Sequence, residues 1–255
     1  MYLTALPLAA VPGLRHAFFT RGEGASDGIY RGLNCGFGSA DDAETVRANR
    51  ARAMAALGFA AETLATPHQV HSARALIARG PDDIAGRKVD AVVTDRPGLP
   101  VGVLTADCAP VLLCDPAARV VAAAHAGWRG ARFGVVEAAL AAMETLGARR
   151  HRVAAAIGPT IGAASYEVGP EFPAHFLGER ADTARFFCRP EGAARAHFDL
   201  PGYLAAKLRR LGLVRVHDLA ADTVADPERF FSYRRSVLNG EPDYGRLLSV
   251  IALEG

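Results

Sequence analysis

Several patterns that mark common protein classes are missing from this chain of 255 residues. Its four cysteines form no C-x-x-C pair, and a chain of this length can bury a hydrophobic core without disulfide bonds. We therefore expect free thiols in a cytoplasmic setting. No apolar run approaches the ~20 residues of a membrane-spanning helix. The formal net charge is only +2, which does not indicate a basic surface that binds nucleic acid or a membrane. We therefore expect neither as a partner.

Lysine is almost absent, because only Lys88 and Lys207 occur and the other 27 of the 29 basic residues are arginine. Together with the abundant alanine, this indicates a compositional bias of the genome. An arginine beside a motif is for that reason a weaker indication of phosphate binding than usual.

The pattern of secondary structure favours an α+β fold. Strands outnumber helices, and no G-x-G-x-x-G follows a predicted strand, which argues against a Rossmann fold. We predict a single layered domain over residues 1–255 with mixed or antiparallel sheets. The predicted strands are 14–20, 70–77, 91–94, 101–105, 111–114, 119–125, 153–157 and 247–253, and the predicted helices are 41–57 with Asp41 and Glu44 as a capping box, 127–146 and 200–211.

Cys108 and His125 flank a predicted β-hairpin in which residues 115–118 form the turn. If the strands 111–114 and 119–125 pair directly at that turn, Cys108 lies opposite His125. Opposed side chains in an antiparallel pair have Cβ atoms about 4.5–5.5 Å apart. A thiolate and an imidazole at this spacing could share one metal ion or one proton.

His71 could complete a metal site with this pair, since zinc favours Cys and His and a catalytic zinc has three protein ligands with one open position. The alternative is a strand histidine and a small core cysteine without a ligand. A third interpretation is a metal-free hydrolase, with Cys108 as the nucleophile and His125 as the base. We expect His68 on the opposite strand face from His71. Asp107 is either a hydrogen-bonding residue or a catalytic base.

The segment Gly127-Trp-Arg-Gly130 opens a predicted helix directly after His125. Free N–H groups at a helix start and the guanidinium of Arg129 suit a phosphate or another anion. The glycines could equally serve a tight strand-to-helix turn.

The segments 105–113 (TADCAPVLL) and 125–130 (HAGWRG) together resemble the paired signatures of one family. This is the purine nucleoside phosphorylase family formerly labelled laccase-domain or multicopper polyphenol oxidase proteins. The resemblance covers nearly the whole chain. Its supporting segments are 19–26 with 32–34, 42–50, 69–71, 157–162 with 166–169, 230–235 and 245–246. One departure from the family pattern is Ala221-Asp-Thr223, where that pattern has Cys-Thr.

The resemblance implies that His71, Cys108 and His125 bind zinc. It implies phosphorolysis of adenosine, inosine or 5′-methylthioadenosine to a free base and a pentose 1-phosphate, with adenosine deamination as a second activity. The expected partners are therefore a purine nucleoside and phosphate. Arg129, Arg47 or Arg246 could hold the phosphate, and the sequence does not choose among them.

The older label keeps a copper-dependent polyphenol oxidase as an alternative. A multicopper oxidase commonly uses H-x-H pairs, whereas the eight histidines here form none. A cluster of several coppers is therefore not expected, although copper binds Cys and His ligands more tightly than most divalent ions and could replace zinc.

Overall fold

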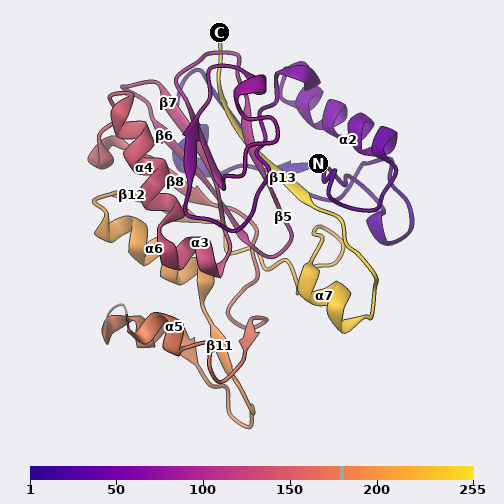
Figure 1. The fold of residues 1–255 in the computed structure, drawn as a ribbon, viewed down its shortest axis with the longest axis vertical. Coiled ribbons are helices and arrows are strands. Elements are labelled where there is room, and N and C mark those ends of the chain that lie inside the picture. The colour runs from indigo at the N-terminus through magenta and orange to yellow at the C-terminus, as the bar shows by residue number, and fades with distance from the viewer. Residues whose placement is uncertain (179–180) are drawn as a thin grey trace.

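The computed structural model describes residues 1–178 and 181–255. Its centre is a six-stranded mixed sheet (Figure 1). The strands lie in the order β12 (Arg215–Asp218), β8 (Ala154–Ile157), β6 (Ala109–Asp115), β7 (Val120–Ala126), β4 (Ala91–Thr94) and β3 (Ala75–Ile77). The two edge strands are parallel to their neighbours, and the four inner strands are antiparallel.

A second, antiparallel sheet packs on one face of the first. Its order is β1 (Tyr2–Leu3), β2 (Leu14–Phe19), β13 (Leu247–Leu253) and β5 (Val101–Thr105). Side chains alternate along β6, so that Leu112 and Cys114 join an apolar cluster between the sheets, whereas Val111 and Leu113 face the other way. The inter-sheet cluster also contains Val103 from β5.

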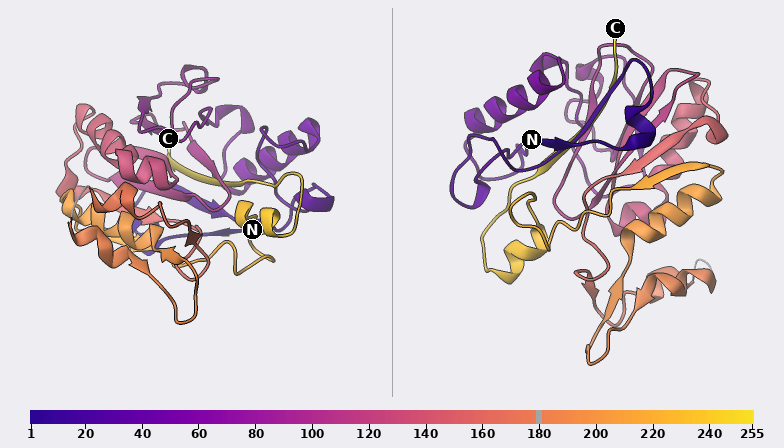
Figure 2. Two further views of the ribbon diagram at one scale, coloured as in Figure 1. Left: turned by 60° about the horizontal axis from the view of Figure 1, so that its bottom comes forward. Right: turned by 180° about the vertical axis from the view of Figure 1, so that it is seen from behind.

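Helices cover the two outer faces, which gives four layers (Figures 1 and 2). Apolar residues of α4 (Val135–Thr145) and α6 (Leu200–Arg210) pack on the outer face of the six-stranded sheet. On the far side, Met54 of α2 (Ala43–Ala56) packs against Leu248 of β13. In the described residues, no helix is both long enough and apolar enough to cross a membrane.

A small lobe projects from this body (Figure 1). It contains a three-stranded sheet of β10 (Phe187–Cys188), β11 (Ala196–Phe198) and β9 (Glu167–Val168), together with α5 (Ala174–Leu177). Stacked and tilted phenylalanine rings hold it together. The remaining helices are α1 (Leu6–Ala9), α3 (Trp128–Phe133), α7 (Tyr233–Leu238) and the 3₁₀ helices η1 (Gly28–Tyr30), η2 (Ala61–Thr63), η3 (Pro81–Asp83), η4 (Arg150–Arg152) and η5 (Ala181–Phe186).

The α+β class and the layered sheets are confirmed, but the predicted hairpin register is wrong. Cys114 pairs with Val121 rather than Arg119, so His125 lies opposite Pro110 and not opposite Cys108. The turn is longer than predicted because Arg119 adopts a left-handed φ of 51° and belongs to the loop. The observed register is shifted by two residues from the predicted one. A shift by an even number keeps side chains on the same face, so Cys108 and His125 share a face of the hairpin and lie diagonal to each other.

Other predicted bounds also need correction. Of the strand predicted at 70–77, only Ala75–Ile77 forms, and His71 lies in an irregular segment. The helix predicted at 127–146 is divided at Gly134, whose φ of 103° ends α3 before α4 begins. The N-cap of α2 is Asp42, which accepts a bond from the Thr45 N–H, rather than Asp41.

Candidate metal centre

Three side chains from separate segments meet at the open end of the hairpin. One ligand atom each of His71, Cys108 and His125 lies within 4.8 Å of the others, and we call this group the His71 cluster. Cys108 Sγ is 3.7 Å from His71 Nε2, and the two imidazole rings lie edge to face with centroids 4.7 Å apart. His71 precedes β3, Cys108 lies in the bend between β5 and β6, and His125 is on β7. His71 is exposed and His125 is buried, so the cluster faces solvent from one side.

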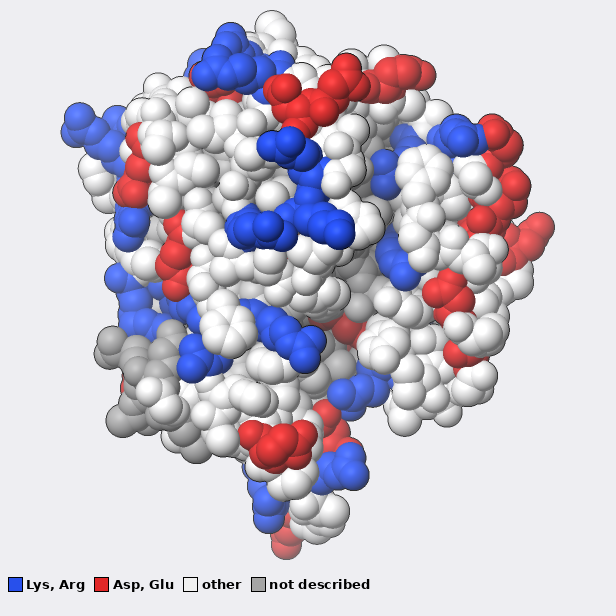
Figure 3. All heavy atoms as spheres, viewed as in Figure 1, with Lys and Arg blue, Asp and Glu red and all other residues white. Residues whose placement is uncertain are grey.

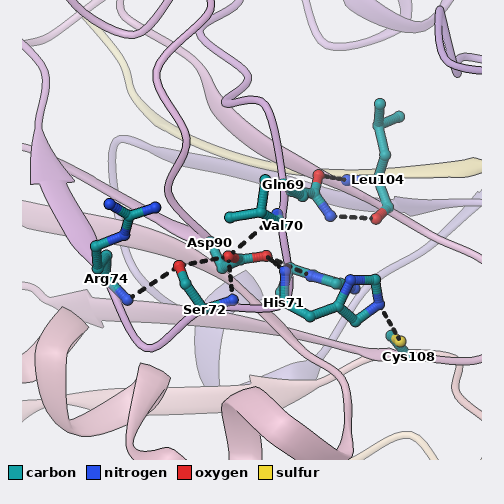
Figure 4. A network of polar contacts seen from close by, with 9 residues as sticks. Gln69, Val70, His71, Ser72, Arg74, Asp90, Leu104 and Cys108 are labelled. Carbon is teal, nitrogen blue, oxygen red and sulfur yellow. Dashed lines mark hydrogen bonds and ion pairs between the residues drawn. The ribbon is translucent and has the colours of Figure 1, made fainter.

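One buried carboxylate, Asp90, orients two of these three residues. Its Oδ1 lies 2.9 Å from His125 Nδ1 and accepts the His71 N–H at 3.0 Å. Its Oδ2 accepts both the N–H and the hydroxyl of Ser72 at 2.6 Å (Figure 4). Because Nδ1 of His125 is engaged by Asp90, Nε2 is the nitrogen left for Cys108 or a metal ion. The bonds to Asp90 also hold His71 at a left-handed φ of 58°, which a non-glycine residue rarely adopts without such support.

The electrostatics of the metal-free cluster favour a thiolate. Burial acts to raise the pKa of Cys108, but the charge of His125 and hydrogen bonds from both histidines outweigh it and lower that pKa to about 6. Burial acts to lower the pKa of His125, whereas Cys108 and Asp90 raise it to about 9. Hydrogen bonds from His125 and Ser72 overcome burial and lower the pKa of Asp90 to about 2. The site thus holds a deprotonated sulfur, which is the form that binds metals.

The backbone beside the cluster leaves room only for glycine. A Cβ on Gly127 would lie 2.8 Å from Cys108 Sγ and 3.0 Å from His71 Cδ2. The donor atoms therefore lie directly over the bare backbone of this residue. Two imidazoles, one thiolate and a carboxylate behind one imidazole form a donor set that fits a single zinc ion, and copper is compatible with the same donors.

Two cavities meet at the cluster. The larger, of about 480 Å³, is lined by His71, His125 and Cys108. Arg50 and Arg246 also line it, and we call it the Arg50 cavity. Arg50 lies 4.4 Å above the Phe37 ring and donates to Cys35 O at 2.8 Å. In the described residues, neither arginine has a carboxylate partner within 4.0 Å. On the face of the molecule drawn in Figure 3, a hollow lies near the middle with basic side chains at its border.

The second cavity, of about 220 Å³, is lined by His71 and Cys108 together with aromatic residues, and we call it the Trp128 cavity. Its aromatic residues are Trp128, Tyr166 and Tyr233. Arg129 lies over the Trp128 ring at 4.7 Å, and Arg234 lies over the Tyr166 ring at 5.6 Å. The two cavities thus share the cluster but differ in lining.

The structure separates the three arginines expected to bind phosphate. Arg246 lines the Arg50 cavity and Arg129 lines the Trp128 cavity. Arg47 lines neither, because it lies on the exposed face of α2 in an ion pair with Glu44. Two residues beside the cluster stand out only in the structure. Arg50 lies within the segment 42–50 that resembles the family, and the one local signal for Asp90 is its position directly before the strand 91–94.

Two residues near the cluster have other roles. His68 lines the Arg50 cavity but is not part of the cluster. The prediction that it lies on the opposite strand face from His71 is wrong, because the segment is not a continuous strand and His68 makes only an isolated bridge to Lys88. Asp107 is a buried hydrogen-bonding residue, since it accepts from the Thr223 hydroxyl and the Arg234 N–H, both at 2.6 Å.

At the departure noted above, Asp222 accepts a bond from the Ser165 hydroxyl at 2.6 Å. Ala221 O accepts from the Thr160 N–H. The segment thus connects to the loop after β8 and, through the Thr223 hydroxyl, to Asp107 beside Cys108.

Comparison with known proteins gives consistent matches over nearly the whole chain. A sequence profile described as "Multi-copper polyphenol oxidoreductase laccase" matches residues 15–254. A protein named purine nucleoside phosphorylase from Deinococcus radiodurans is 42% identical over 99% of this chain and 95% of its own length. Purine nucleoside phosphorylase ORF3 from Streptomyces griseus is 40% identical over 91% of this chain and 94% of its own.

Solved structures agree with the fold. The Neisseria meningitidis protein NMB0706, assigned to the DUF152 family, superposes with a TM-score of 0.87 at 34% identity, covering 100% of this chain and 99% of that one. The Bacillus licheniformis hypothetical protein YfiH superposes with the same TM-score of 0.87 at 25% identity, covering 94% and 93%.

Proposed function

Because this chain belongs to the family described as multi-copper polyphenol oxidoreductase laccase, and its relatives are named purine nucleoside phosphorylase, we propose that it is a zinc-dependent purine nucleoside phosphorylase. The observation that supports this most is the position of the His71 cluster between two cavities that differ in lining. The expected reaction joins adenosine, inosine or 5′-methylthioadenosine to phosphate and gives the free base and a pentose 1-phosphate.

The two linings suit the two substrates. Cleavage of a glycosidic bond passes through an oxocarbenium-like state, so an anion beside the sugar stabilises it. Arg50 and Arg246 would hold phosphate, because both present charge to the larger cavity without a carboxylate partner in the described chain. The rings of Trp128 and Tyr166 would hold the flat purine.

His71, Cys108 and His125 would hold the metal ion between these two substrates. Zinc at this position would supply a Lewis acid. Asp90 keeps the His125 ring in the tautomer and orientation that a metal ligand needs. Cys108 would contribute the negative charge of its thiolate and so offset the charge of the ion.

Adenosine deamination is a second activity that we propose for the same centre. The observation that favours it is the three-donor set, since catalytic zinc sites combine three protein ligands with an open position for water. A multicopper oxidase is less well supported. Within residues 1–178 and 181–255, the His71 cluster is the one group of three or more metal-binding side chains, which suffices for one ion and not for several.

Product analysis tests the proposal. The protein is incubated with adenosine, with and without phosphate, and products are identified by mass. We expect adenine and ribose 1-phosphate only when phosphate is present, and inosine under both conditions. Absence of free base with phosphate present, or base release that does not depend on phosphate, would refute phosphorolysis. Oxidation of a phenol with consumption of oxygen, and no reaction with nucleosides, would support the oxidase instead.

Two arginine variants sharpen this assay. Arg246→Gln removes a charge from the Arg50 cavity and should raise the KM for phosphate by about tenfold or more. Arg47→Gln is the matched control, since this exposed side chain lines neither cavity and its removal should change that KM by less than about twofold. An equal change of the KM for phosphate in the two variants would contradict the assignment of Arg246 to phosphate binding.

A further inference from the structure

A third cavity, of about 380 Å³, lies where two distant parts of the chain meet. The loop after β2 supplies Arg21 and Arg31, and the segment around the start of α7 supplies Phe231 and Arg235. We call it the Arg21 cavity. It contains no residue of the His71 cluster, and Tyr244 is the one lining residue that it shares with the Arg50 cavity. The proposed reaction therefore gives it no role.

The charge of this cavity is not balanced. Three guanidinium groups line it, whereas its one carboxylate belongs to Glu241. In the chain as described, none of the three arginines has a carboxylate within 4.0 Å. Burial lowers the pKa of Arg21, and the charges of Arg235 and Arg31 lower it further, while the smaller opposing effects of Glu228 and Glu241 do not cancel this shift. An anion would relieve this repulsion.

Two of the three arginines, Arg21 and Arg235, are held in place by carbonyl groups, which fix a guanidinium without neutralising it. Arg21 donates from Nε and Nη2 to Arg31 O at 3.1 and 3.0 Å, and from Nη1 to Pro227 O at 3.1 Å. Its guanidinium also lies 4.5 Å above the ring of Phe231. Arg235 donates through Nη1 to Thr223 O at 2.7 Å. Side chains that are already ordered lose less conformational entropy when a ligand binds.

The backbone of the loop that carries Arg21 is also tightly constrained. A Cβ on Gly24 would lie 2.0 Å from the carbonyl carbon of Gly32, and one on Gly32 would lie 1.8 Å from Arg21 O. Gly32 has a φ of 112°, so another residue would be strained there in any case. Two glycines thus allow the loop to close on itself beneath Arg21.

We propose that the Arg21 cavity is a second ligand site and that it binds the phosphate monoester of a small organic molecule, a sugar phosphate being the simplest case. Planar guanidinium groups match phosphate oxygens in paired hydrogen bonds. Ile29, Phe231 and Tyr244 add apolar surface for the organic part of the ligand. The volume of about 380 Å³ falls in the range of small-molecule sites.

Calorimetric titration with ribose 5-phosphate tests this site, with ribose and inorganic phosphate as the two comparison ligands. We expect ribose 5-phosphate to bind most tightly, inorganic phosphate to bind the same site more weakly, and ribose not to bind. Inorganic phosphate is also expected in the Arg50 cavity, so only the binding that Arg31→Glu removes is assigned to the Arg21 cavity. If that binding is as tight for inorganic phosphate as for the ester, the organic part contributes nothing and the assignment to a monoester is overturned.

Charge variants locate the binding. The side chain of Arg31 is exposed and makes no hydrogen bond in the described structure, so Arg31→Glu should fold and should weaken ribose 5-phosphate binding by about tenfold or more. Glu241→Gln removes the opposing charge and should tighten binding by about threefold. Arg79→Glu is the matched control for charge reversal, because Arg79 is exposed and lines none of these cavities.

A variant of the other cavity separates the two sites. Arg246→Gln should retain the ribose 5-phosphate isotherm that Arg31→Glu loses. The proposal is overturned if Arg31→Glu binds as tightly as Arg79→Glu, or if Arg246→Gln alone abolishes binding. Because the measurement is of binding, it gives its answer whether or not the protein proves to be a phosphorylase.

Discussion

The two ends of the β6–β7 hairpin carry the same kinds of residue in opposite states. At the closed end, burial and the nearby Asp115 raise the pKa of Cys114 to about 12, so this thiol stays protonated. At the open end, the charge and hydrogen bonds of His125 and His71 lower the pKa of Cys108 to about 6. Cys114 packs in the apolar cluster between the sheets, whereas Cys108 lies beside two imidazoles. Partners rather than burial therefore decide which thiol can bind a metal.

A buried aspartate accompanies each thiol and shows the same contrast. Asp115 accepts hydrogen bonds from the Arg149 N–H at 2.8 Å and from Arg152 Nε at 3.0 Å, and so fixes the turn and the segment after α4. Asp90 instead fixes the imidazole of His125 and the backbone of His71. One carboxylate stabilises the fold, and the other orients the candidate metal ligands.

The largest difference between the two ends is expected when their thiols are removed one at a time. Cys108→Ala should lose the metal and reduce phosphorolysis by more than about a thousandfold, since a catalytic zinc contributes several kcal/mol to transition-state stabilisation. Cys114→Ala should keep both and lose only about 1–2 kcal/mol of unfolding free energy through reduced packing. Elemental analysis, activity and denaturant unfolding of both variants check this. Equal metal content in the two variants would contradict the claim that Cys108, and not Cys114, binds the metal.

The next largest difference is expected in the rates at which Cys108 and Cys114 are alkylated. In protein stripped of metal, Cys108 is expected to react with an alkylating reagent at least about a hundredfold faster than Cys114 at pH 7, because it is a thiolate and is less buried. Its rate should rise as pH increases through about 6 and then level. Mass spectrometry of the labelled peptides measures both rates.

The same labelling tests the cysteine-hydrolase alternative. With metal bound, labelling of Cys108 should be slow until a chelator is added. Fast labelling of the untreated protein, together with acyl transfer to Cys108, would favour the hydrolase.

A smaller effect is expected from the two carboxylates. Asp90→Asn should weaken metal binding by about 10–100-fold, because the His125 ring loses its orienting acceptor. Asp115→Asn should leave metal affinity unchanged and cost about 1–3 kcal/mol of unfolding free energy. Metal competition with a chromophoric chelator and urea unfolding measure the two effects. Weakened metal binding in Asp115→Asn would contradict the division of roles.

The Asp115 contribution should also depend on pH. Hydrogen bonds from Arg149 and Arg152 outweigh burial and lower its pKa below the ordinary value of 3.8. The stability that it supplies is therefore present above that value and is lost as pH falls through the folded-state pKa. Asp115→Asn should remove this part of the acid dependence.

The smallest effect concerns the space beneath the cluster. A methyl group on Gly127 would press on Cys108 Sγ and His71 Cδ2, so Gly127→Ala should weaken metal binding by about three- to tenfold. Gly80→Ala is the control, because a Cβ there meets nothing within 4 Å and its φ of −158° suits alanine. Equal metal affinity of the two variants would show that the donors can shift freely.

Regular, buried elements could be predicted from the sequence and the irregular site could not. The strands at 91–94, 101–105 and 247–253 have the bounds that the sequence predicts, because they are short and mostly apolar segments rich in β-branched residues. The strands of the small lobe are only two or three residues long, which is too short for a periodic pattern. The hairpin register depended on whether Arg119 joins the turn, and its left-handed φ decided this.

The meeting of His71, Cys108 and His125 was anticipated through the family resemblance, whereas spacing alone left the alternatives open. His71 was expected on a strand but is held in a loop by Asp90, which is 19 residues away. That contact belongs to the tertiary structure, and no local pattern around residue 71 indicates it. Arg50 and Asp90 were missed for the same reason, since each acts through partners distant in the sequence.

The central claim is that the open end of the hairpin holds one zinc ion. Anomalous difference maps from crystals of untreated protein, with data collected above and below the zinc absorption edge, test it most directly. The account predicts one strong peak in contact with His71, Cys108 and His125 that is present only above the zinc edge. A peak that persists below that edge, a peak elsewhere, or three well-ordered side chains without any peak would contradict it.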